Sequence, residues 1–235
     1  MHIYHCRLTL HESLFFATRE LGRLYETGRY LHNYALTYAF GQVQAPWFNA
    51  EQSPRYAEDL LPLNGQFYVT PAMPEQVTFQ LNTFKYGEEQ LHVEMLQAER
   101  NTPSFGRAKE LAPESTFICY VLSAMPLQLP RWIRLGKWHS KVAVDMEALK
   151  FEERDGVYSA VSALNPLDVP EGMLRAFDIV SMPPASLVVN AHLAGRYYAI
   201  GGPGHGLPMH MHYNIPIAVP VEKPKTAARK GAFDG

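Results

Sequence analysis

The chain has 235 residues, of which 47% are hydrophobic, and its formal net charge at neutral pH is −2. This length suits one large domain with a sizeable core, and the near-neutral charge excludes a uniformly basic nucleic-acid binder. No apolar run is long enough to cross a membrane, and the first residues lack the pattern of a secretory signal. We therefore expect a cytoplasmic protein whose two cysteines, Cys6 and Cys119, stay reduced.

The first expected element is a strand over residues 3–10. Tyr4, Cys6, Leu8 and Leu10 alternate with polar residues, which is typical of a half-buried strand. A helix is expected over residues 28–40, because Thr27 can serve as its N-cap and Gly41 suits the C′ position. Its expected apolar face consists of two stripes at helical spacing, namely Tyr30, Tyr34 and Tyr38 beside Leu31, Ala35 and Ala39.

After a shorter helix that is expected to begin at Ser53–Pro54, strand patterns dominate the chain. The expected strands are residues 67–70, 77–84, 91–96, 116–123, 132–135, 141–144, 157–164, 186–193, 196–200 and 214–219. Residues 99–115 show no period and are expected to form a mobile loop, and residues 223–235 are expected to be a disordered basic tail. The sequence thus predicts a single strand-rich α+β domain over residues 1–222.

Residues 131–141, "RWIRLGKWHSK", are the part of the chain that most resembles a nucleic-acid-binding segment. They contain four cations and no acid, together with two tryptophans and one histidine: Arg131, Arg134, Lys137, Lys141, Trp132, Trp138 and His139. Cations along a strand can neutralise phosphates, and indoles can stack on unpaired bases. Alternatively, both tryptophans belong to the core and the cations lie around them. Arg19, Arg23 and Arg29 have the same two interpretations, solvated charge or phosphate contact.

A glycine- and histidine-rich stretch, "GGPGHGLPMHMHYNIP", occupies residues 201–216. His210 and His212 would share one face of a strand, as in the opening of the cupin metal motif, but no carboxylate follows them. The stretch could also be a plain surface loop. As a third possibility, it could be a loop whose bare backbone approaches a phosphate, formed by Gly201, Gly202, Gly204, His205 and Gly206. We expect neither a metal ligand nor a catalytic residue, because no hydrolytic motif is present.

Three stretches together resemble one family. Residues 1–41, "WIRLGKWHSK" at 132–141 and "GGPGHGLP" at 201–208 are similar to the type I-D version of the fifth Cas subunit, in the RAMP superfamily of CRISPR-associated proteins. The resemblance implies a modified ferredoxin-like (RRM-like) RAMP domain with an inserted β-hairpin thumb and a strand-rich extension. It also implies a glycine-rich loop near the carboxyl end.

The function that this resemblance implies is non-catalytic. One copy caps the 5′ handle of the CRISPR RNA in the Cascade surveillance complex, beside the backbone subunit and the large subunit, near the protospacer-adjacent motif of target DNA. No cofactor is implied. A related subtype uses its fifth subunit to cut precursor RNA, so a metal-independent endoribonuclease is the alternative. The expected RNA contacts are Arg19, Arg23, Arg29, Arg131, Trp132, Arg134, Lys137, Trp138, His139, Lys141, Gly201, Gly202, Gly204, His205 and Gly206.

Overall fold

A six-stranded antiparallel sheet forms the centre of the computed structural model, which describes residues 1–43, 54–85 and 105–215. Its strands are β1 (His2–Leu10), β4 (Phe67–Val69), β5 (Met73–Gln76), β8 (Thr116–Ser123), β9 (Trp132–Leu135) and β10 (Ser140–Leu149). They lie in the order β4-β8-β1-β10-β9, and β5 also pairs with β8. β9 and β10 are joined by a tight turn, so the basic-aromatic segment is one hairpin at the end of this sheet.

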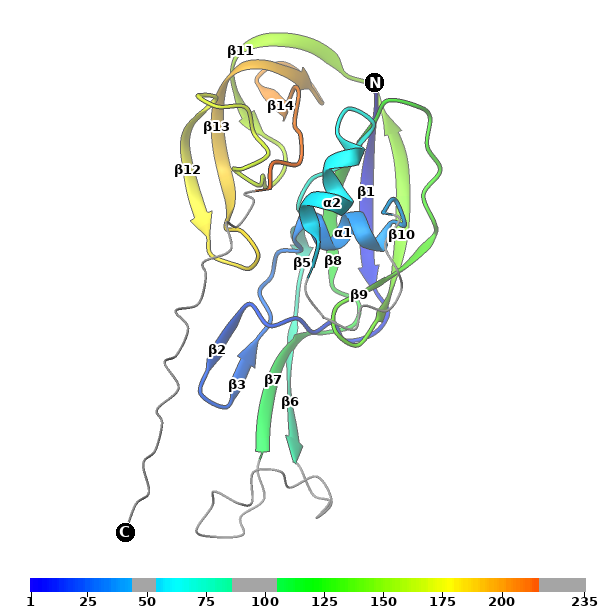
Figure 1. The fold of residues 1–235 in the computed structure, drawn as a ribbon, viewed down its shortest axis with the longest axis vertical. Coiled ribbons are helices and arrows are strands. Elements are labelled where there is room, and N and C mark those ends of the chain that lie inside the picture. Colours follow the sequence, from blue (N-terminus) through cyan, green and yellow to red (C-terminus); the bar gives the residue numbers. More distant parts are fainter. Residues whose placement is uncertain (44–53, 86–104, 216–235) are drawn as a thin grey trace, which may run out of the picture.

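Two four-stranded sheets flank the central one. The second sheet contains β11 (Glu152–Ala160), β12 (Leu174–Val180), β13 (Leu187–Ala199) and β14 (His205–Pro208). It curls on itself, because β11 pairs with both β13 and β14. The third sheet contains β2 (Arg19–Leu21), β3 (Leu24–Glu26), β6 (Phe79–Lys85) and β7 (Phe105–Leu111). Figure 1 shows β6 and β7 extending away from the central sheet as a projecting hairpin.

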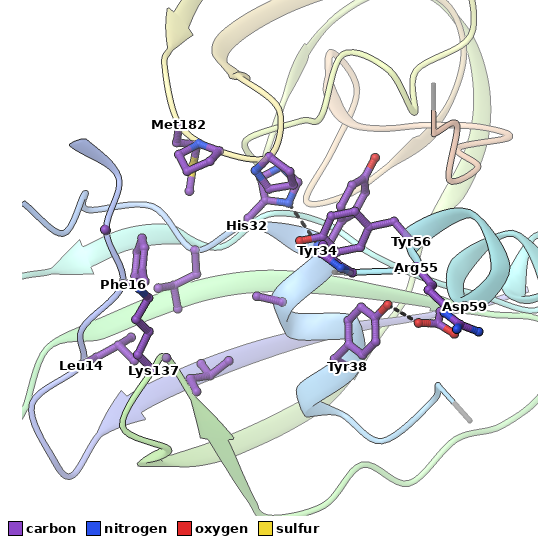
Figure 2. Close-up of a pocket in the computed structure, with 18 of the residues that line it drawn as sticks. Leu14, Phe16, His32, Tyr34, Tyr38, Arg55, Tyr56, Asp59, Lys137 and Met182 are labelled. Atoms are coloured by element: carbon purple, nitrogen blue, oxygen red, sulfur yellow. Dashed lines mark hydrogen bonds between the residues drawn. The ribbon is translucent and has the colours of Figure 1, made fainter. Parts of the chain in front are cut away.

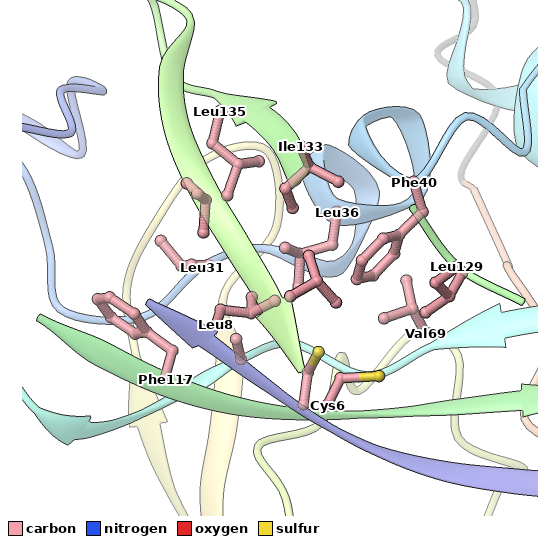
Figure 3. Close-up of a cluster of buried hydrophobic side chains, with 14 of the residues drawn as sticks. Cys6, Leu8, Leu31, Leu36, Phe40, Val69, Phe117, Leu129, Ile133 and Leu135 are labelled. Carbon is pink, nitrogen blue, oxygen red and sulfur yellow. The ribbon is translucent and has the colours of Figure 1, made fainter. Parts of the chain in front are cut away.

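The helices are short and follow one another: α1 (Asn33–Ala39), α2 (Tyr56–Leu60) and the 3₁₀ turn η1 (Leu61–Leu63). None of the helices in the described ranges could span a bilayer. α1 packs over one face of the central sheet, where Leu36 and Phe40 meet the side chains of β1 and β9 (Figure 3). The expected alternation in β1 is confirmed, because Cys6 and Leu8 are fully buried in this cluster while Arg7 is exposed.

A buried polar network connects the central sheet to the second sheet region. The Asp168 carboxylate accepts hydrogen bonds from Asn33 Nδ2 at 2.8 Å, Tyr68 Oη at 2.9 Å and the backbone N–H of Asn214 at 3.0 Å. Asp168 is only 3% exposed. A buried carboxylate needs several donors to remain ionised, so these contacts fix α1, β4 and residue 214 relative to one another.

The predicted start of the long helix is wrong, because α1 begins at Asn33 and not after Thr27. Leu31 forms a β-bridge with Ala72, in which each backbone N–H donates to the other residue's carbonyl at 3.1 and 2.9 Å. His32 is the N-cap, and its Nδ1 accepts the N–H of Tyr34 at 3.2 Å. The predicted end is confirmed, since Gly41 follows the helix with φ +72°.

The expected apolar face of the helix is also partly wrong. Ala35 is exposed, and the buried residues are Asn33, Tyr34, Leu36 and Thr37. The short helix α2 begins at Tyr56 with Arg55 as its N-cap, and Ser53 lies outside the described residues.

Several strand predictions need correction. Residues 105–111 of the expected loop 99–115 form β7, while residues 99–104 lie outside the described part of the chain, as do 91–96 and 223–235. The two strands expected at 186–193 and 196–200 are one strand, β13, which continues through Gly195 with φ +136°. Residues 214 and 215 are not in a strand, and the rest of 214–219 is not described. The strands expected at 116–123 and 132–135 are confirmed as β8 and β9.

Candidate nucleic-acid interface

The β9–β10 hairpin carries all seven of the residues expected to bind RNA between 131 and 141. Ile133 and Leu135 point into the core, whereas Trp132 and Arg134 alternate with them and are exposed. The two tryptophans are 45% and 51% exposed, so the interpretation that they belong to the core is wrong. Half-exposed indoles on a strand are available to stack on another ring system.

Trp132 has a cation and an imidazole as neighbours. The Nζ atom of Lys141 lies 4.1 Å from the centroid of the indole, and the ring of His11 packs edge-on at 4.7 Å. Lys141 is the register partner of Arg134, which lies two residues after Trp132 in β9 and on the same face. The hairpin therefore presents an aromatic ring and a positive charge in direct contact. This combination suits the base and the phosphate of a nucleotide.

Trp138 and the turn of the hairpin are held against the segment that follows β1. Phe15 stacks on Trp138 with a centroid separation of 4.8 Å and an interplanar angle of 26°. Lys137 donates its backbone N–H to the carbonyl of Phe15 at 2.9 Å. Gly136 has φ +73°, and a Cβ at this position would lie 2.6 Å from the same carbonyl oxygen. Only glycine permits this close approach, so the turn is held in a fixed position against the backbone of Phe15.

Not all the cations of the hairpin are equally available. Nη1 of Arg134 lies 3.3 Å from a carboxylate oxygen of Glu12 and 3.1 Å from the carbonyl of His139. That carboxylate also accepts the backbone N–H of Lys141 at 2.7 Å. Arg131 and Lys137 are exposed, and within the described residues neither forms an ion pair. These two cations and Lys141 are the ones best placed to meet a phosphate.

A second hairpin, β2–β3, carries Arg19 and Arg23 together with Glu20 and Glu26. Arg19 forms an ion pair with Glu26 at 2.7 Å, and Lys109 of β7 approaches the same carboxylate at 3.5 Å. The Arg19 hydrogen bond is the main reason that the pKa of Glu26 is lowered from its ordinary value. Arg23 follows the turn at Gly22. Residues 15–18 join the two hairpins, since Phe15 contacts Trp138 while Thr18 bonds to the Glu26 carbonyl at 3.0 Å.

Arg29 is exposed and its guanidinium lies 5.9 Å from the centroid of the Tyr30 ring. The sequence placed Arg29 at a helix start, where the helix dipole would favour a bound phosphate. Because α1 begins at Asn33, Arg29 lies outside the first turn, and this argument no longer applies.

The glycine stretch lies apart from both hairpins. Gly201, Gly202 and Gly204 have positive φ and form the turn between β13 and β14, whereas His205 and Gly206 belong to β14 and not to a loop. β14 lies near the top of Figure 1, and β2 and β3 lie in its lower half. The structure thus connects the β2–β3 and β9–β10 hairpins through residues 15–18 and leaves the glycine stretch separate.

The histidine pair that suggested a metal does not have the expected geometry. His210 and His212 are both exposed, and neither is in a strand. His210 has φ +60°. The shared strand face that a cupin-like pair requires is therefore not formed.

Sequence reasoning missed a row of polar side chains on the second sheet. Nδ1 of His192 lies 3.1 Å from Oγ of Ser159, and His205 is the register partner of Ser159 on the other edge of β11. Both imidazoles are exposed. Register partners point to the same face of a sheet, so two imidazoles flank one hydroxyl. His192 lies outside "GGPGHGLP", in the strand that precedes it, and only its alternation with the buried residues Ala191 and Leu193 marked it as outward-facing.

An elongated groove of about 920 Å³ lies between α1, α2, the β9–β10 turn and residues 182–184. Figure 2 shows Phe16 and Lys137 at one end, Arg55 and Asp59 at the other, and His32 and Tyr34 between them. Burial lowers the pKa of His32 to about 4, so this imidazole is neutral at physiological pH.

The sequence was compared with known proteins. The family model described as "Type I-D CRISPR-associated protein Cas5/Csc1" matches residues 1–216. Among curated protein sequences, no relative matches.

Two solved structures match the chain at low similarity. A chain of the cryo-EM structure of the Type III-B Cmr-beta bound to cognate target RNA and AMPPnP has 9% identity and a TM-score of 0.47. The match covers 81% of this chain and 86% of that one. A CRISPR protein from Archaeoglobus fulgidus has 12% identity and a TM-score of 0.37, over 86% and 97% of the two chains.

Proposed function

The chain belongs to the type I-D CRISPR-associated Cas5/Csc1 family, and from this premise we propose that it is a non-catalytic, RNA-binding subunit of a Cascade surveillance complex. In this role it binds and caps the 5′ handle of the CRISPR RNA. The observation that carries the proposal is the pair of half-exposed tryptophans on one hairpin, surrounded by exposed cations. Exposure of apolar rings to water is unfavourable, so the stacking of bases on these rings lowers the free energy.

The chemistry of single-stranded RNA fits this surface. Indole faces accept unpaired bases without strong preference for sequence, at roughly 1–3 kcal/mol per base. Arg131 and Lys141 lie on the same hairpin and can each neutralise a phosphate, whereas Lys137 lies at the turn, at one end of the groove beside α1. The β2–β3 hairpin extends the basic surface through Arg19 and Arg23. A capping subunit needs such local contacts and no uniformly positive exterior, in keeping with a net charge of −2.

The remaining parts of the proposal concern partners. The projecting β6–β7 hairpin takes the role of the thumb, and the subunit lies between the backbone subunit and the large subunit. From there it helps to position target DNA near the protospacer-adjacent motif. Sequence recognition of the target comes from pairing with the guide RNA, so the protein contributes contacts to backbone and irregular RNA. We place this assembly in the cytoplasm.

The test is a binding titration of the full chain with a fluorescent single-stranded RNA that carries the repeat-derived 5′ handle, at several salt concentrations. The double variant R131A/K141A should bind about tenfold more weakly, and its salt slope should fall by about 1.4, the value for two lost phosphate contacts on a single strand. Trp132→Ala should lose about 1–3 kcal/mol of binding free energy with an unchanged slope.

Two results decide the outcome. K150A serves as the control, because Lys150 is exposed just beyond β10, away from the tryptophans. K150A removes one cation where R131A/K141A removes two, so a change in binding free energy and salt slope half as large for K150A would mean that only net charge matters. No effect of any variant would rule out the hairpin as the RNA contact.

A metal-independent endoribonuclease is the second candidate, and the row His192–Ser159–His205 favours it. Two imidazoles near one hydroxyl could act as general base and general acid on a ribose 2′-hydroxyl and a leaving 5′-oxygen. The backbone N–H groups of the adjacent glycine turn could meet the phosphate. This candidate needs the RNA to reach β11 and β14, away from the β2–β3 and β9–β10 hairpins.

A cleavage assay separates the two candidates. The purified chain is incubated with a repeat RNA in EDTA, and the products are resolved on a gel. Cleavage that is lost in both His192→Ala and His205→Ala, and retained in the control His212→Ala, would establish the enzyme. We expect no cleavage by any of these proteins.

A further inference from the structure

The groove beside α1 has a lining that differs from the two hairpins. Its walls are mostly aromatic and aliphatic side chains, including Phe16, Tyr34, Tyr38 and Tyr56. Ala35 lies on the exposed side of α1, and its small side chain leaves the groove open to solvent at this point. A volume of about 920 Å³ is large enough for several side chains of a ligand.

The charges of the lining balance one another. Arg55 pairs with Glu58 at 3.3 Å, and Asp59 accepts a hydrogen bond from the hydroxyl of Tyr38 at 2.6 Å. Lys137, at the opposite end, has no ion pair among the described residues. A strand of RNA carries one negative charge per nucleotide and would meet two carboxylates at the α2 end. The groove therefore disfavours a nucleic-acid backbone along its length.

The imidazole of His32 forms part of the groove wall. His32 is 4% exposed, and its Nδ1 accepts the N–H of Tyr34, so the proton of the neutral ring is on Nε2. The backbone of Ala185 lies against this imidazole, and Nε2 is buried. A ligand in the groove therefore does not reach Nε2, and its recognition depends on the aromatic side chains and on Lys137.

We infer that the groove receives an extended segment of a partner polypeptide, with apolar side chains against the tyrosines and an acidic group facing Lys137. Aromatic rings in a groove are typical anchors of protein interfaces, and a free cation at one end sets the direction of the segment. This inference rests on the proposed function, since the partner is another protein subunit of the same complex. A nucleotide in the groove is the competing occupant.

The experiment places a photoreactive diazirine amino acid at position 35 in the assembled, RNA-containing particle. A matched particle carries the same residue at Ala148, which is exposed on β10 and does not line the groove. After irradiation, mass spectrometry identifies the cross-linked product. We expect position 35 to yield a cross-link to an apolar stretch of another subunit, and position 148 not to yield it. Lys137→Glu should lower that yield at least about fivefold, whereas Lys150→Glu should not.

Several results would overturn the inference. These are a cross-link to RNA, to the same chain or to a second copy of it, or no product above the position-148 control. If substitution of Ala35 prevents assembly, the photoreactive residue is placed at position 137, on the exposed turn at the other end of the groove, with the same criteria. RNA retention is measured on the same particles. Retained RNA without the cross-link defeats only the groove inference, whereas a particle that forms without RNA contact to this subunit defeats the proposed function.

Discussion

Gly206 occupies a point in β14 where the neighbouring strand leaves room for a hydrogen atom alone. A Cβ there would overlap the carbonyl oxygen of Tyr198 and meet the ring of Tyr197 at 2.7 Å. Backbone cannot move aside as a flexible side chain can, so the strand pairing itself must shift.

Gly206→Ala should therefore destabilise the protein by about 1–3 kcal/mol through overpacking of the second sheet. Gly201→Ala is the control, because no atom lies within 4 Å of its Cβ and only its φ of +73° opposes a side chain. That strain is worth about 1 kcal/mol. Denaturant unfolding of the full chain measures both. A smaller loss for Gly206→Ala than for Gly201→Ala would contradict the close approach.

His32 and Asp168 are two buried residues whose protonation affects stability in opposite directions. Burial lowers the pKa of His32 from 6.5 to about 4, so its contribution to stability is complete above pH 6.5 and is lost as the pH falls towards 4. Burial raises the pKa of Asp168 from 3.8 to about 6, so its contribution is complete below pH 3.8 and is lost as the pH rises through 6. Between pH 4 and 6 the two effects oppose each other.

Single substitutions should separate the two effects. The difference in unfolding free energy between the parent and His32→Asn should change by about 3 kcal/mol between pH 4 and 6.5, with the parent gaining stability as the pH rises. For Asp168→Asn the difference should change by a similar amount between pH 4 and 6, with the parent losing stability as the pH rises. Urea titrations at four or five pH values measure both. Differences that do not vary with pH would show that these groups titrate normally.

At the scale of elements, the sequence predicted strands well where apolar and polar residues alternate. β1, β8 and β9 are such cases, since one face of each strand is buried and the pattern is local. β7 was missed because its Lys109 and Glu110 disguise the alternation, and Glu110 is buried. The start of α1 was missed because Leu31 pairs with Ala72, a contact that no local capping rule contains.

The candidate site was predictable to a similar degree. The composition of residues 131–141 identified the basic-aromatic hairpin, but its sequence could not show whether Trp132 and Trp138 were exposed. The exposure of these indoles depends on which side of β9 faces the core and on the packing of Phe15 against Trp138 in the turn. His192 could not be found at all, because its neighbour Ser159 belongs to a different strand.

The root of the projecting hairpin depends on a buried carboxylate. Glu110 of β7 accepts hydrogen bonds from Asn82 Nδ2 at 2.7 Å and from Gln80 Nε2 at 3.2 Å, both on β6. Glu110→Ala should leave the Asn82 amide without its acceptor and the Gln80 amide with Ser13 alone, which costs about 1–3 kcal/mol locally. Amide hydrogen exchange should become about tenfold faster or more in β6 and β7 and stay unchanged in β1 and β8. Glu147→Ala is the control, because Glu147 is an exposed residue of β10. Equal exchange in the two variants would contradict a structural role for Glu110.

At the scale of the whole molecule, the distribution of charge matters more than its sum. The net charge of −2 conceals a basic segment at the edge of the central sheet, a β2–β3 hairpin whose two arginines are matched by two glutamates, and a groove with balanced charges. Some of that positive charge is already paired, because Glu26 holds both Arg19 and Lys109. The positions of the acidic side chains therefore decide how many of the cationic side chains are available to a phosphate.

Glu26→Gln tests whether the β2–β3 hairpin belongs to the RNA surface. The substitution releases Arg19 and Lys109, so handle RNA should bind about two- to fivefold more tightly, and the salt slope should steepen by about 0.7 for each cation that gains a phosphate. Glu152→Gln is the matched control: it also raises the net charge by one unit, but it releases Arg154, paired at 2.7 Å, on β11 of the second sheet. Tighter binding in both variants would mean that the RNA responds to total charge, whereas no change in Glu26→Gln would confine the RNA to the β9–β10 hairpin.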